Sequence, residues 1–297
     1  MNWKVIAKAL RAHQWAKNIL LAVPLVAAHK VSQLDAWFNL ATAFIAFGLV
    51  ASATYLVNDL VDLQSDRLHP QKRFRPLASG QLSVKAALML APILGFTGLC
   101  VSILLLPAGF VGYLLVYVVL TLGYSFDLKR RLLVDVLALA TLYTLRILAG
   151  GAAINVIVSE WLLMFSLFMF ISLAFLKRVI ELQGKEDGLK LSGRGYSVTD
   201  LDTMRSIGVS SSLISVLVLA LYVNSPATAG LYQAPQVLWL MCPVLIYWIA
   251  RIWFLAARNQ VHHDPVVFAL LDWRSYVVGI IGLAVVFVAT VGTPWTR

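Results

Sequence analysis

The sequence predicts an all-α integral membrane protein with nine transmembrane helices, and three observations lead to that prediction. Hydrophobic residues make up 60% of the chain and charged residues only 13%, and the mean hydropathy is +0.83. This is far more apolar surface than a soluble core of this length could bury, so lipid is the expected solvent. Long apolar runs recur along the whole chain, and basic residues gather between alternate runs.

Most of the apolar runs approach the roughly 20 residues that a helix needs to cross a bilayer. Barrel strands would instead show only about ten residues of alternating polarity. The first run is short and carries Pro24, so its span is expected to begin nearer Trp15 and to pass His29. Since no soluble domain is left over, residues 1–297 are expected to form a single transmembrane domain. The nine runs are Asn18–Ala28, Ala36–Val57, Ala86–Leu106, Phe110–Phe126, Val134–Ile154, Trp161–Phe175, Ile207–Val223, Val237–Ala250 and Tyr276–Val291.

The positions of the 24 lysines and arginines predict the orientation. Nearly all lie in the amino-terminal segment and in alternate connections, whereas the intervening loops and the tail hold only Lys30 and Arg297. By the positive-inside rule, the amino terminus and the charged loops face the cytoplasm, and the carboxyl terminus lies on the other side. An odd number of helices is then required. Because topology accounts for the net charge of +10, that charge does not indicate a nucleic-acid partner.

An acidic motif closes the second predicted helix, with the sequence Asn58-Asp-Leu-Val-Asp-Leu-Gln-Ser-Asp66. If helical geometry persists, Asp59, Asp62 and Asp66 lie along one stripe, with Asn58 at its edge. Stacked carboxylates repel one another and oppose the helix macrodipole, so a cation should offset both costs. Hard oxygen ligands of this kind suit Mg²⁺. The structural alternative is a solvated helix end that pairs with the bases after it, although acids at a membrane edge are usually functional.

Basic and polar residues at the same predicted face are the candidate substrate ligands. Lys72 and Arg73 follow the acidic motif, where they would hold phosphate oxygens, although a positive-inside loop alone would also contain bases. Arg146 lies within the fifth run, where it either pairs with an acid or points at a substrate. Lys177 and Glu181 also have the spacing of a simple helix-stabilising pair. The other candidates at a predicted membrane edge are Lys17, Lys129, Asp135 and Arg178.

The acidic motif at Asn58–Asp66 resembles the first aspartate-rich motif of the UbiA superfamily of intramembrane prenyltransferases. Within that superfamily, the chain is most similar to the branch of decaprenyl-phosphate phosphoribosyltransferase. Where aromatic prenyltransferases of the superfamily carry a second acidic motif, DxxxD, the chain reads Lys177-Arg-Val-Ile-Glu181. The branch resemblance rests on the segments Arg11–Asn18, Tyr124–Lys129 with Asp135, Leu145–Gly151, Leu176–Leu182 and Gly193–Tyr196.

The resemblance implies a UbiA-like bundle of nine helices around an active cavity at the cytoplasmic side of a bacterial inner membrane. The implied reaction transfers 5-phosphoribose from phosphoribosyl diphosphate to a polyprenyl phosphate and releases diphosphate, as a step of cell-envelope biosynthesis. Asp59, Asp62 and Asp66 would be catalytic and, with Asn58, would hold Mg²⁺. Tyr124 and Tyr196 join the substrate-binding candidates. A UbiA-like enzyme of this kind could also form a homo-oligomer.

Two other functions remain open at this stage. An aromatic prenyltransferase would keep the fold but would use prenyl diphosphate and an aromatic acceptor. A transporter or flippase of an anionic lipid would use a basic cavity without any chemistry. A flippase has little need of three stacked acids at one face, and this disfavours it.

Overall fold

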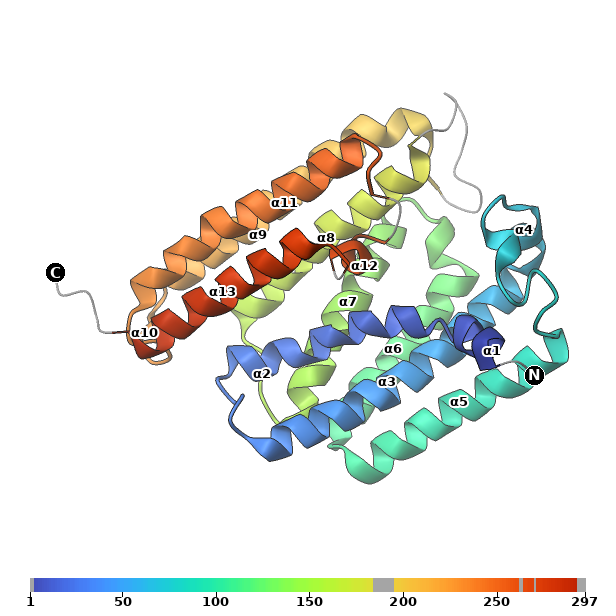
Figure 1. The fold of residues 1–297 in the computed structure, drawn as a ribbon, viewed down its shortest axis with the longest axis horizontal. Helices are drawn as coiled ribbons and strands as arrows, with labels where there is room; N and C mark the ends of the chain where they lie inside the picture. Colours follow the sequence, from blue (N-terminus) through green and yellow to red (C-terminus); the bar gives the residue numbers. More distant parts are fainter. Residues whose placement is uncertain (1–2, 184–194, 262–263, 270, 293–297) are drawn as a thin grey trace. The chain divides into compact units, whose positions relative to one another are not determined.

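The structure is a computed structural model that describes residues 3–183, 195–261, 264–269 and 271–292. Over these residues the chain is helical and has no β-strand, which confirms the all-α prediction (Figure 1). The chain divides into two compact units, Met1–Val158 and Ser159–Arg297, and each is described by itself. The single domain expected over residues 1–297 stays a prediction.

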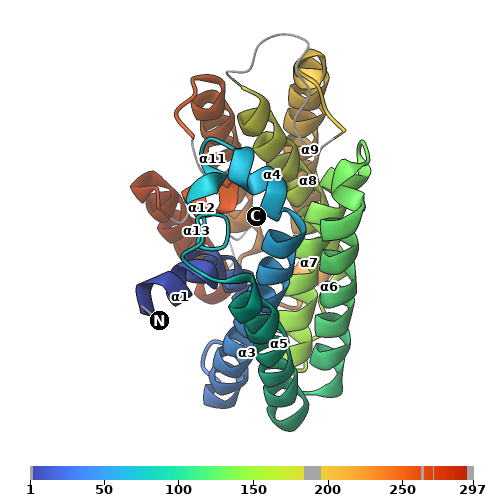
Figure 2. The same cartoon turned by 90° about the vertical axis from the view of Figure 1, so that its right-hand side faces the viewer.

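Unit 1 is built around the long helix α3, which packs along α5 and also contacts α6 and α7 (Figures 1 and 2). The short helix α4 continues from α3, and two 3₁₀ turns, η2 and η3, follow α4 and α6. Its elements are α1 Trp3–Ala9, η1 Ala12–Ala22, α2 Val23–Ala27, α3 Leu34–Val61, α4 Leu63–Leu68, η2 Lys72–Phe74, α5 Val84–Leu105, α6 Ala108–Phe126, η3 Leu128–Arg130 and α7 Val134–Ala153.

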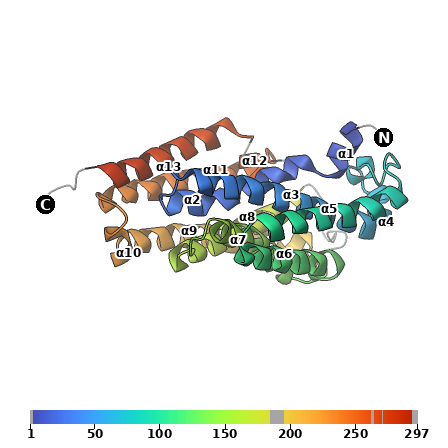
Figure 3. The same ribbon diagram turned by 90° about the horizontal axis from the view of Figure 1, so that it is seen from below.

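Unit 2 contains four long helical segments, and α8 packs along α9 within it. The helices α11 and α13 lie side by side, as Figure 3 shows. Short 3₁₀ and α-helical turns connect these segments. The elements are α8 Glu160–Leu182, η4 Val198–Asp200, α9 Leu201–Val223, α10 Pro226–Ala229, η5 Pro235–Leu240, α11 Met241–Ala257, α12 Pro265–Ala269 and α13 Trp273–Val291.

Eight helices in the described part of the chain are long and apolar enough to cross a membrane, and they correspond to the second to ninth predicted runs. The first run differs, because it forms the 3₁₀ helix η1 followed by the short helix α2, which carries Pro24 in its first turn. A 3₁₀ helix rises about 2.0 Å per residue, against about 1.5 Å for an α-helix. The eleven residues of η1 and the five of α2 therefore extend about 30 Å, which is the thickness of a bilayer core. A ninth span stays a prediction.

Large apolar side chains cover the outer faces of several spans. Phe96 and Leu104 on α5 are 71% and 78% exposed, and Val119 on α6 is 71% exposed. A protein in water rarely presents so much contiguous apolar surface. The chain is therefore an integral membrane protein whose outer helical faces contact lipid.

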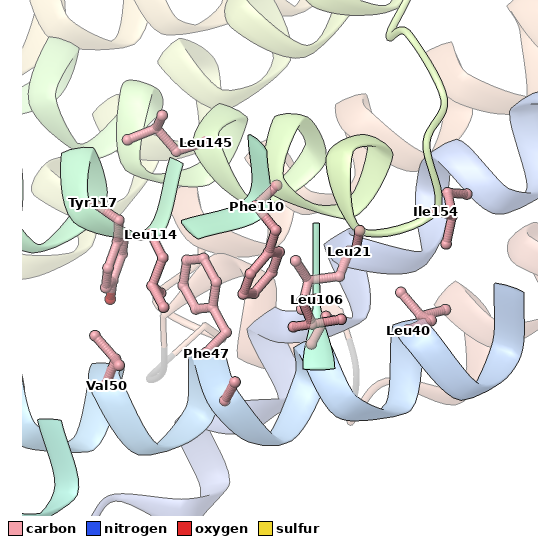
Figure 4. Close-up of a cluster of buried hydrophobic side chains, with 14 of the residues drawn as sticks. Leu21, Leu40, Phe47, Val50, Leu106, Phe110, Leu114, Tyr117, Leu145 and Ile154 are labelled. Atoms are coloured by element: carbon pink, nitrogen blue, oxygen red, sulfur yellow. The ribbon is translucent and has the colours of Figure 1, made fainter. Parts of the chain in front are cut away.

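The core of unit 1 lies where η1, α3, α6 and α7 meet (Figure 4). Leu21 from η1, Phe47 from α3, and Phe110 and Leu114 from α6 are fully buried in it. The rings of Phe47 and Tyr117 are 4.5 Å apart between centroids. This core anchors the amino-terminal segment against the bundle, next to the polar residues described below.

Gly150 on α7 permits the close approach of η1. A Cβ atom built at Gly150 would lie 2.1 Å from the backbone oxygen of Leu21. We expect Gly150→Ala to lower the free energy of unfolding by about 1–3 kcal/mol, since backbone cannot move aside as a flexible side chain can. The measurement is the thermal midpoint in detergent. Gly112→Ala on α6 is the control, because no atom lies within 4 Å of its added Cβ; equal midpoints for the two variants would contradict this packing.

The orientation taken from the positive-inside rule makes a direct labelling prediction. In a background with Cys100 and Cys242 replaced by alanine, a cysteine at Gln71 should react only with a reagent supplied from the cytoplasmic side. A reporter fused after Arg297 should be extracytoplasmic, because nine spans place the two termini on opposite sides. Labelling of residue 71 from outside would contradict the orientation, and a cytoplasmic reporter would contradict the odd number of spans.

Candidate functional site

The acidic motif lies where α3 ends and α4 begins. Asp59 is in the last turn of α3, Asp62 separates the two helices, and Asp66 belongs to α4. The Asp62 N–H donates to the Asn58 carbonyl at 2.9 Å, and the Asp66 N–H donates to the Asp62 carbonyl at 2.8 Å. Helical hydrogen bonding thus continues through the break. Asp59 and Asp66 are only 4% and 3% exposed.

Two arginines neutralise the buried carboxylates. Arg11 donates from Nη2 to Asp59 Oδ1 in a short ion pair. Arg75 Nη1 lies 3.2 Å from Asp59 Oδ1 and also contacts Asp66 Oδ2 closely. A single guanidinium nitrogen therefore connects Asp59 to Asp66. Burial in a nonpolar setting makes an unpaired carboxylate costly, and these contacts offset that cost.

Arg11 reaches the acidic motif from an unusual backbone conformation. It lies between α1 and η1 with φ 50° and ψ 46°, in the left-handed region. A residue with a side chain rarely adopts this conformation, and such residues concentrate at functional sites. The turn ends α1 and brings the Arg11 guanidinium to Asp59. The carbon of the same guanidinium lies 5.2 Å from the ring centroid of Tyr55.

Asp62 has a separate cation. Lys129 in η3 is 4% exposed, and its Nζ lies 2.6 Å from Asp62 Oδ1 and 3.5 Å from Asn58 Oδ1. Close by in the chain, the Tyr124 hydroxyl donates to Asp135 Oδ1 at 2.8 Å, and Asp135 is fully buried in the first turn of α7. The structure thus joins Lys129 to Asn58 and Asp62 of the acidic motif, whereas the sequence suggested Lys129 only as a separate candidate.

The three aspartates have different cationic partners in this structure. Among the described residues, no group of three or more Asp, Glu, His or Cys side chains is close enough to hold a metal ion. Asp59 and Asp66 share Arg75, whereas Asp62 pairs with Lys129. The carboxylates of the expected stripe therefore pair with two different sets of basic residues, which come from other elements of unit 1.

Arg146 in α7 is buried among aromatic rings. Its guanidinium carbon lies 5.0 to 5.8 Å from the ring centroids of Phe47, Tyr117 and Tyr143. It donates to the Tyr117 hydroxyl at 3.2 Å, to Asn18 Oδ1 at 3.4 Å and to the Leu142 carbonyl at 2.6 Å. In the described ranges of the chain no carboxylate forms an ion pair with Arg146. The structure of these ranges therefore does not support the alternative in which Arg146 pairs with an acid. Cation–π contacts and hydrogen bonds stabilise the charge instead.

Lys17 lies near Arg146 on the amino-terminal segment. It is 6% exposed, and its Nζ is 5.4 Å from the ring centroid of Tyr143. Tyr143 therefore contacts both cations, one from η1 and one from α7. Two buried cations beside one ring form an electropositive region in unit 1, distinct from the ion pairs around Asp59 and Asp62.

The candidates in unit 2 have acidic partners. Lys177 Nζ lies 3.0 Å from Asp264 Oδ2, and Arg178, which is fully buried, lies 2.5 Å from Glu181 Oε2. Tyr196 is 1% exposed. The sequence spacing suggested a pair between Lys177 and Glu181. In the structure Glu181 forms an ion pair with Arg178, and Lys177 forms one with Asp264, which precedes α12.

Two basic residues that contact the acids were not among the predicted ligands. The guanidinium of Arg73 stacks on the ring of its neighbour Phe74 at 4.9 Å, and Lys72 opens η2. The missed residues are Arg11 and Arg75. Both lie in segments that the sequence analysis had identified. Arg11 begins the segment Arg11–Asn18, and Arg75 is two positions after Arg73. The prediction thus identified the correct segments but chose other basic residues within them.

Comparison with known families gives a match that covers most of the chain. The profile described as the UbiA prenyltransferase family matches residues 19–276. The solved structure of a UbiA homolog from Archaeoglobus fulgidus bound to GPP and Mg²⁺ has a similar fold, with a TM-score of 0.70 over 96% of this chain and 99% of that one. At 14% identity, the likeness concerns the fold alone.

Three curated relatives have higher identity. An uncharacterized protein of Sinorhizobium fredii, y4nM, is 39% identical over 91% of this chain, which spans only 53% of that protein. Nodulation protein NoeC of Azorhizobium caulinodans is 36% identical over 93% of this chain and 90% of its own length. Decaprenyl-phosphate phosphoribosyltransferase of Mycobacterium tuberculosis is 37% identical over 60% of each chain. The chain thus spans about half of the first of these relatives.

Proposed function

The chain belongs to the UbiA prenyltransferase family, and from that premise we propose that it transfers 5-phosphoribose from phosphoribosyl diphosphate to a polyprenyl phosphate. The relative named decaprenyl-phosphate phosphoribosyltransferase supports this choice of reaction. The observation that carries it is the convergence of buried carboxylates and arginines at Asp59 and Asp66. Metal-bound diphosphate requires carboxylates for the metal and bases for the phosphate oxygens, and both are present there.

The carboxylate pair fits a divalent ion. Arg75 Nη1 contacts both Asp59 and Asp66, so this pair already accommodates a positive group between its members. Mg²⁺ in proteins commonly takes one or two carboxylates and completes its shell with water and substrate phosphate oxygens. Asp59 and Asp66 are therefore the proposed ligands, with Asn58 and Asp62 as further candidates. The ion would neutralise charge on the leaving diphosphate.

The proposed reaction needs little proton transfer from the protein. An oxygen of the acceptor phosphate forms a bond to C1 of the ribose while the C1–O bond to diphosphate breaks, and the electron pair leaves with diphosphate. The acceptor phosphate is already an anion near neutral pH, so no general base is required. The task of the protein is to hold two mutually repelling anions together, which basic residues such as Arg11, Arg75 and Lys129 would do.

Lys177 is proposed to bind a substrate phosphate, and its removal should act on affinity. We expect Lys177→Ala to raise the KM of the substrate whose phosphate it binds about tenfold, with little change in kcat. A charge-assisted hydrogen bond to a phosphate that does not react is equally strong in the ground state and in the transition state. Steady-state kinetics at varied donor and acceptor concentrations would measure this. Arg205→Ala is the control, because Arg205 is a partly exposed base of α9 that pairs with Asp202. A fall in kcat at unchanged KM would contradict the assignment.

The experiment that tests the proposed reaction compares two substrate pairs on the purified protein with Mg²⁺. Phosphoribosyl diphosphate with a polyprenyl phosphate should give a lipid-linked phosphoribose, and prenyl diphosphate with an aromatic acid should give no product. The second pair represents the aromatic prenyltransferase alternative, whose fold is equally compatible with the Archaeoglobus likeness. Product from the second pair alone would overturn the choice of reaction. Lipid movement across the bilayer without product from either pair would indicate a flippase.

A further inference from the structure

An apolar groove runs between α11 and α13 in unit 2, and the proposed reaction does not use it. Its volume is about 390 Å³, within the range of about 300–1,000 Å³ that small-molecule sites occupy. Val244 and Tyr247 line it from α11, and Val277 and Ile281 from the first turns of α13. The lining is almost entirely apolar. Apolar surface of this kind favours contact with a hydrocarbon chain over contact with water.

One end of the groove carries a cation beside an aromatic ring. Trp273 and Arg274 open α13 and line the groove there, and the Arg274 guanidinium lies 5.5 Å from the ring of Trp273. Arg274 is exposed, and in the part of the chain that the structure describes no carboxylate pairs with it. Tryptophan beside arginine at the start of a span is typical of the level of lipid headgroups.

The acid closest in sequence to Arg274 is already engaged. Both oxygens of Asp272 accept from Arg251, at 2.6 and 2.9 Å, and Asp272 also accepts from the backbone N–H and hydroxyl of Ser275. Burial raises the pKa of Asp272, but the hydrogen bonds from Arg251 and Ser275 and the charge of Arg251 outweigh this and hold the pKa below its usual value. The Asp272 charge is therefore committed to fixing α13 against α11, and Arg274 keeps a net positive charge at the groove.

We propose that this groove binds an anionic phospholipid of the bilayer, with its phosphate on Arg274 and an acyl chain along Val244, Val277 and Ile281. Apolar lining, an exposed cation at one end and an interfacial tryptophan match the two parts of such a lipid. Basic pockets between transmembrane helices at the membrane edge recognise anionic headgroups in this way. The site consists only of unit 2 residues and does not depend on the proposed reaction.

Native mass spectrometry of the purified full chain tests the proposal, with phosphatidylglycerol and phosphatidylcholine of identical acyl chains added stepwise. The wild-type protein should retain phosphatidylglycerol in preference to phosphatidylcholine. Arg274→Ala should reduce the affinity for phosphatidylglycerol about fivefold, since one basic residue near a membrane surface contributes about that much to anionic-lipid binding. Arg258→Ala is the control, because Arg258 is an exposed arginine that follows α11 and does not line the groove; it should retain the lipid as the wild type does.

A second variant addresses the apolar part of the site. Val278 lines the groove, and Val278→Phe should lower retention of phosphatidylglycerol by filling the space of the acyl chain. Unchanged retention by Arg274→Ala, or equal retention of both phospholipids by the wild type, would overturn the proposal. Tighter Arg274-dependent binding of a polyprenyl phosphate than of phosphatidylglycerol would overturn the choice of occupant. None of these readouts requires turnover, so they remain valid if the proposed reaction fails.

Discussion

Replacing Asp59 with asparagine should lower kcat about a thousandfold while the protein remains folded in detergent. Asparagine keeps the shape of the side chain and an acceptor oxygen for Arg11 and Arg75, but it removes the charge that a divalent ion requires. Loss of several kcal/mol of electrostatic stabilisation of the leaving diphosphate corresponds to an effect of this size. Product formation by the variant and the wild type, measured with saturating substrates, would quantify it.

The control for this variant lies on the same helix. Asp35→Asn changes an exposed aspartate in the first turn of α3, at the opposite end from Asp59, and it should leave kcat within about twofold, the usual range for a surface substitution. Activity of the wild type that survives removal of divalent ions by a chelator would count decisively against the role given to Asp59.

Replacing Arg75 with alanine should destabilise the protein in a way that Mg²⁺ partly reverses. Without Arg75, Asp59 and Asp66 lose a shared positive charge while both stay buried. Breaking a fully buried ion pair lowers the free energy of unfolding by about 3–5 kcal/mol. Because Arg75 is partly exposed, we expect Arg75→Ala to lower it by about 2–3 kcal/mol. A divalent ion bound between the carboxylates would replace the lost charge. Thermal midpoints with and without millimolar Mg²⁺ should therefore differ more for the variant than for the wild type.

Arg131→Ala provides the comparison for Arg75→Ala. Arg131 forms an ion pair with Asp127 at 2.7 Å, but its side chain is 63% exposed. Exposed pairs contribute about 0–1 kcal/mol, so the midpoint of this variant should barely change, with or without Mg²⁺. If Mg²⁺ shifts Arg75→Ala no more than it shifts Arg131→Ala, then the Asp59 and Asp66 pair does not bind the ion.

The helical architecture could be predicted because each span carries its own signal. Run length and apolar content located eight of the spans, since a helix in lipid satisfies its backbone hydrogen bonds within itself. The segment Ala12–Ala27 could not be predicted in the same way. Its first part, Ala12–Ala22, is a 3₁₀ helix that packs against α3 and α7 and approaches Gly150 closely. Such tertiary contacts are not visible in the local sequence.

The acids of the site could be predicted and their partners could not. Three aspartates at helical spacing are visible within nine residues, but Arg11 reaches Asp59 across 48 positions and Lys129 reaches Asp62 across 67. Long-range pairing of this kind depends on how the helices assemble. The same reason explains Arg146, whose aromatic neighbours come from α3, α6 and α7, so that its surroundings could not be read from α7 alone.

The most direct measurement of the proposed reaction follows two labels of phosphoribosyl diphosphate through one turnover with a polyprenyl phosphate. Phosphorus-32 at the 5-phosphate should appear in the organic-soluble lipid product, because the ribose carries that phosphate to the acceptor. Phosphorus-32 in the diphosphate should remain in the aqueous phase as inorganic diphosphate, because the C1–O bond is the one that breaks. Absence of the 5-phosphate label from the lipid, or transfer of the diphosphate label to it, would contradict phosphoribosyl transfer by this chain.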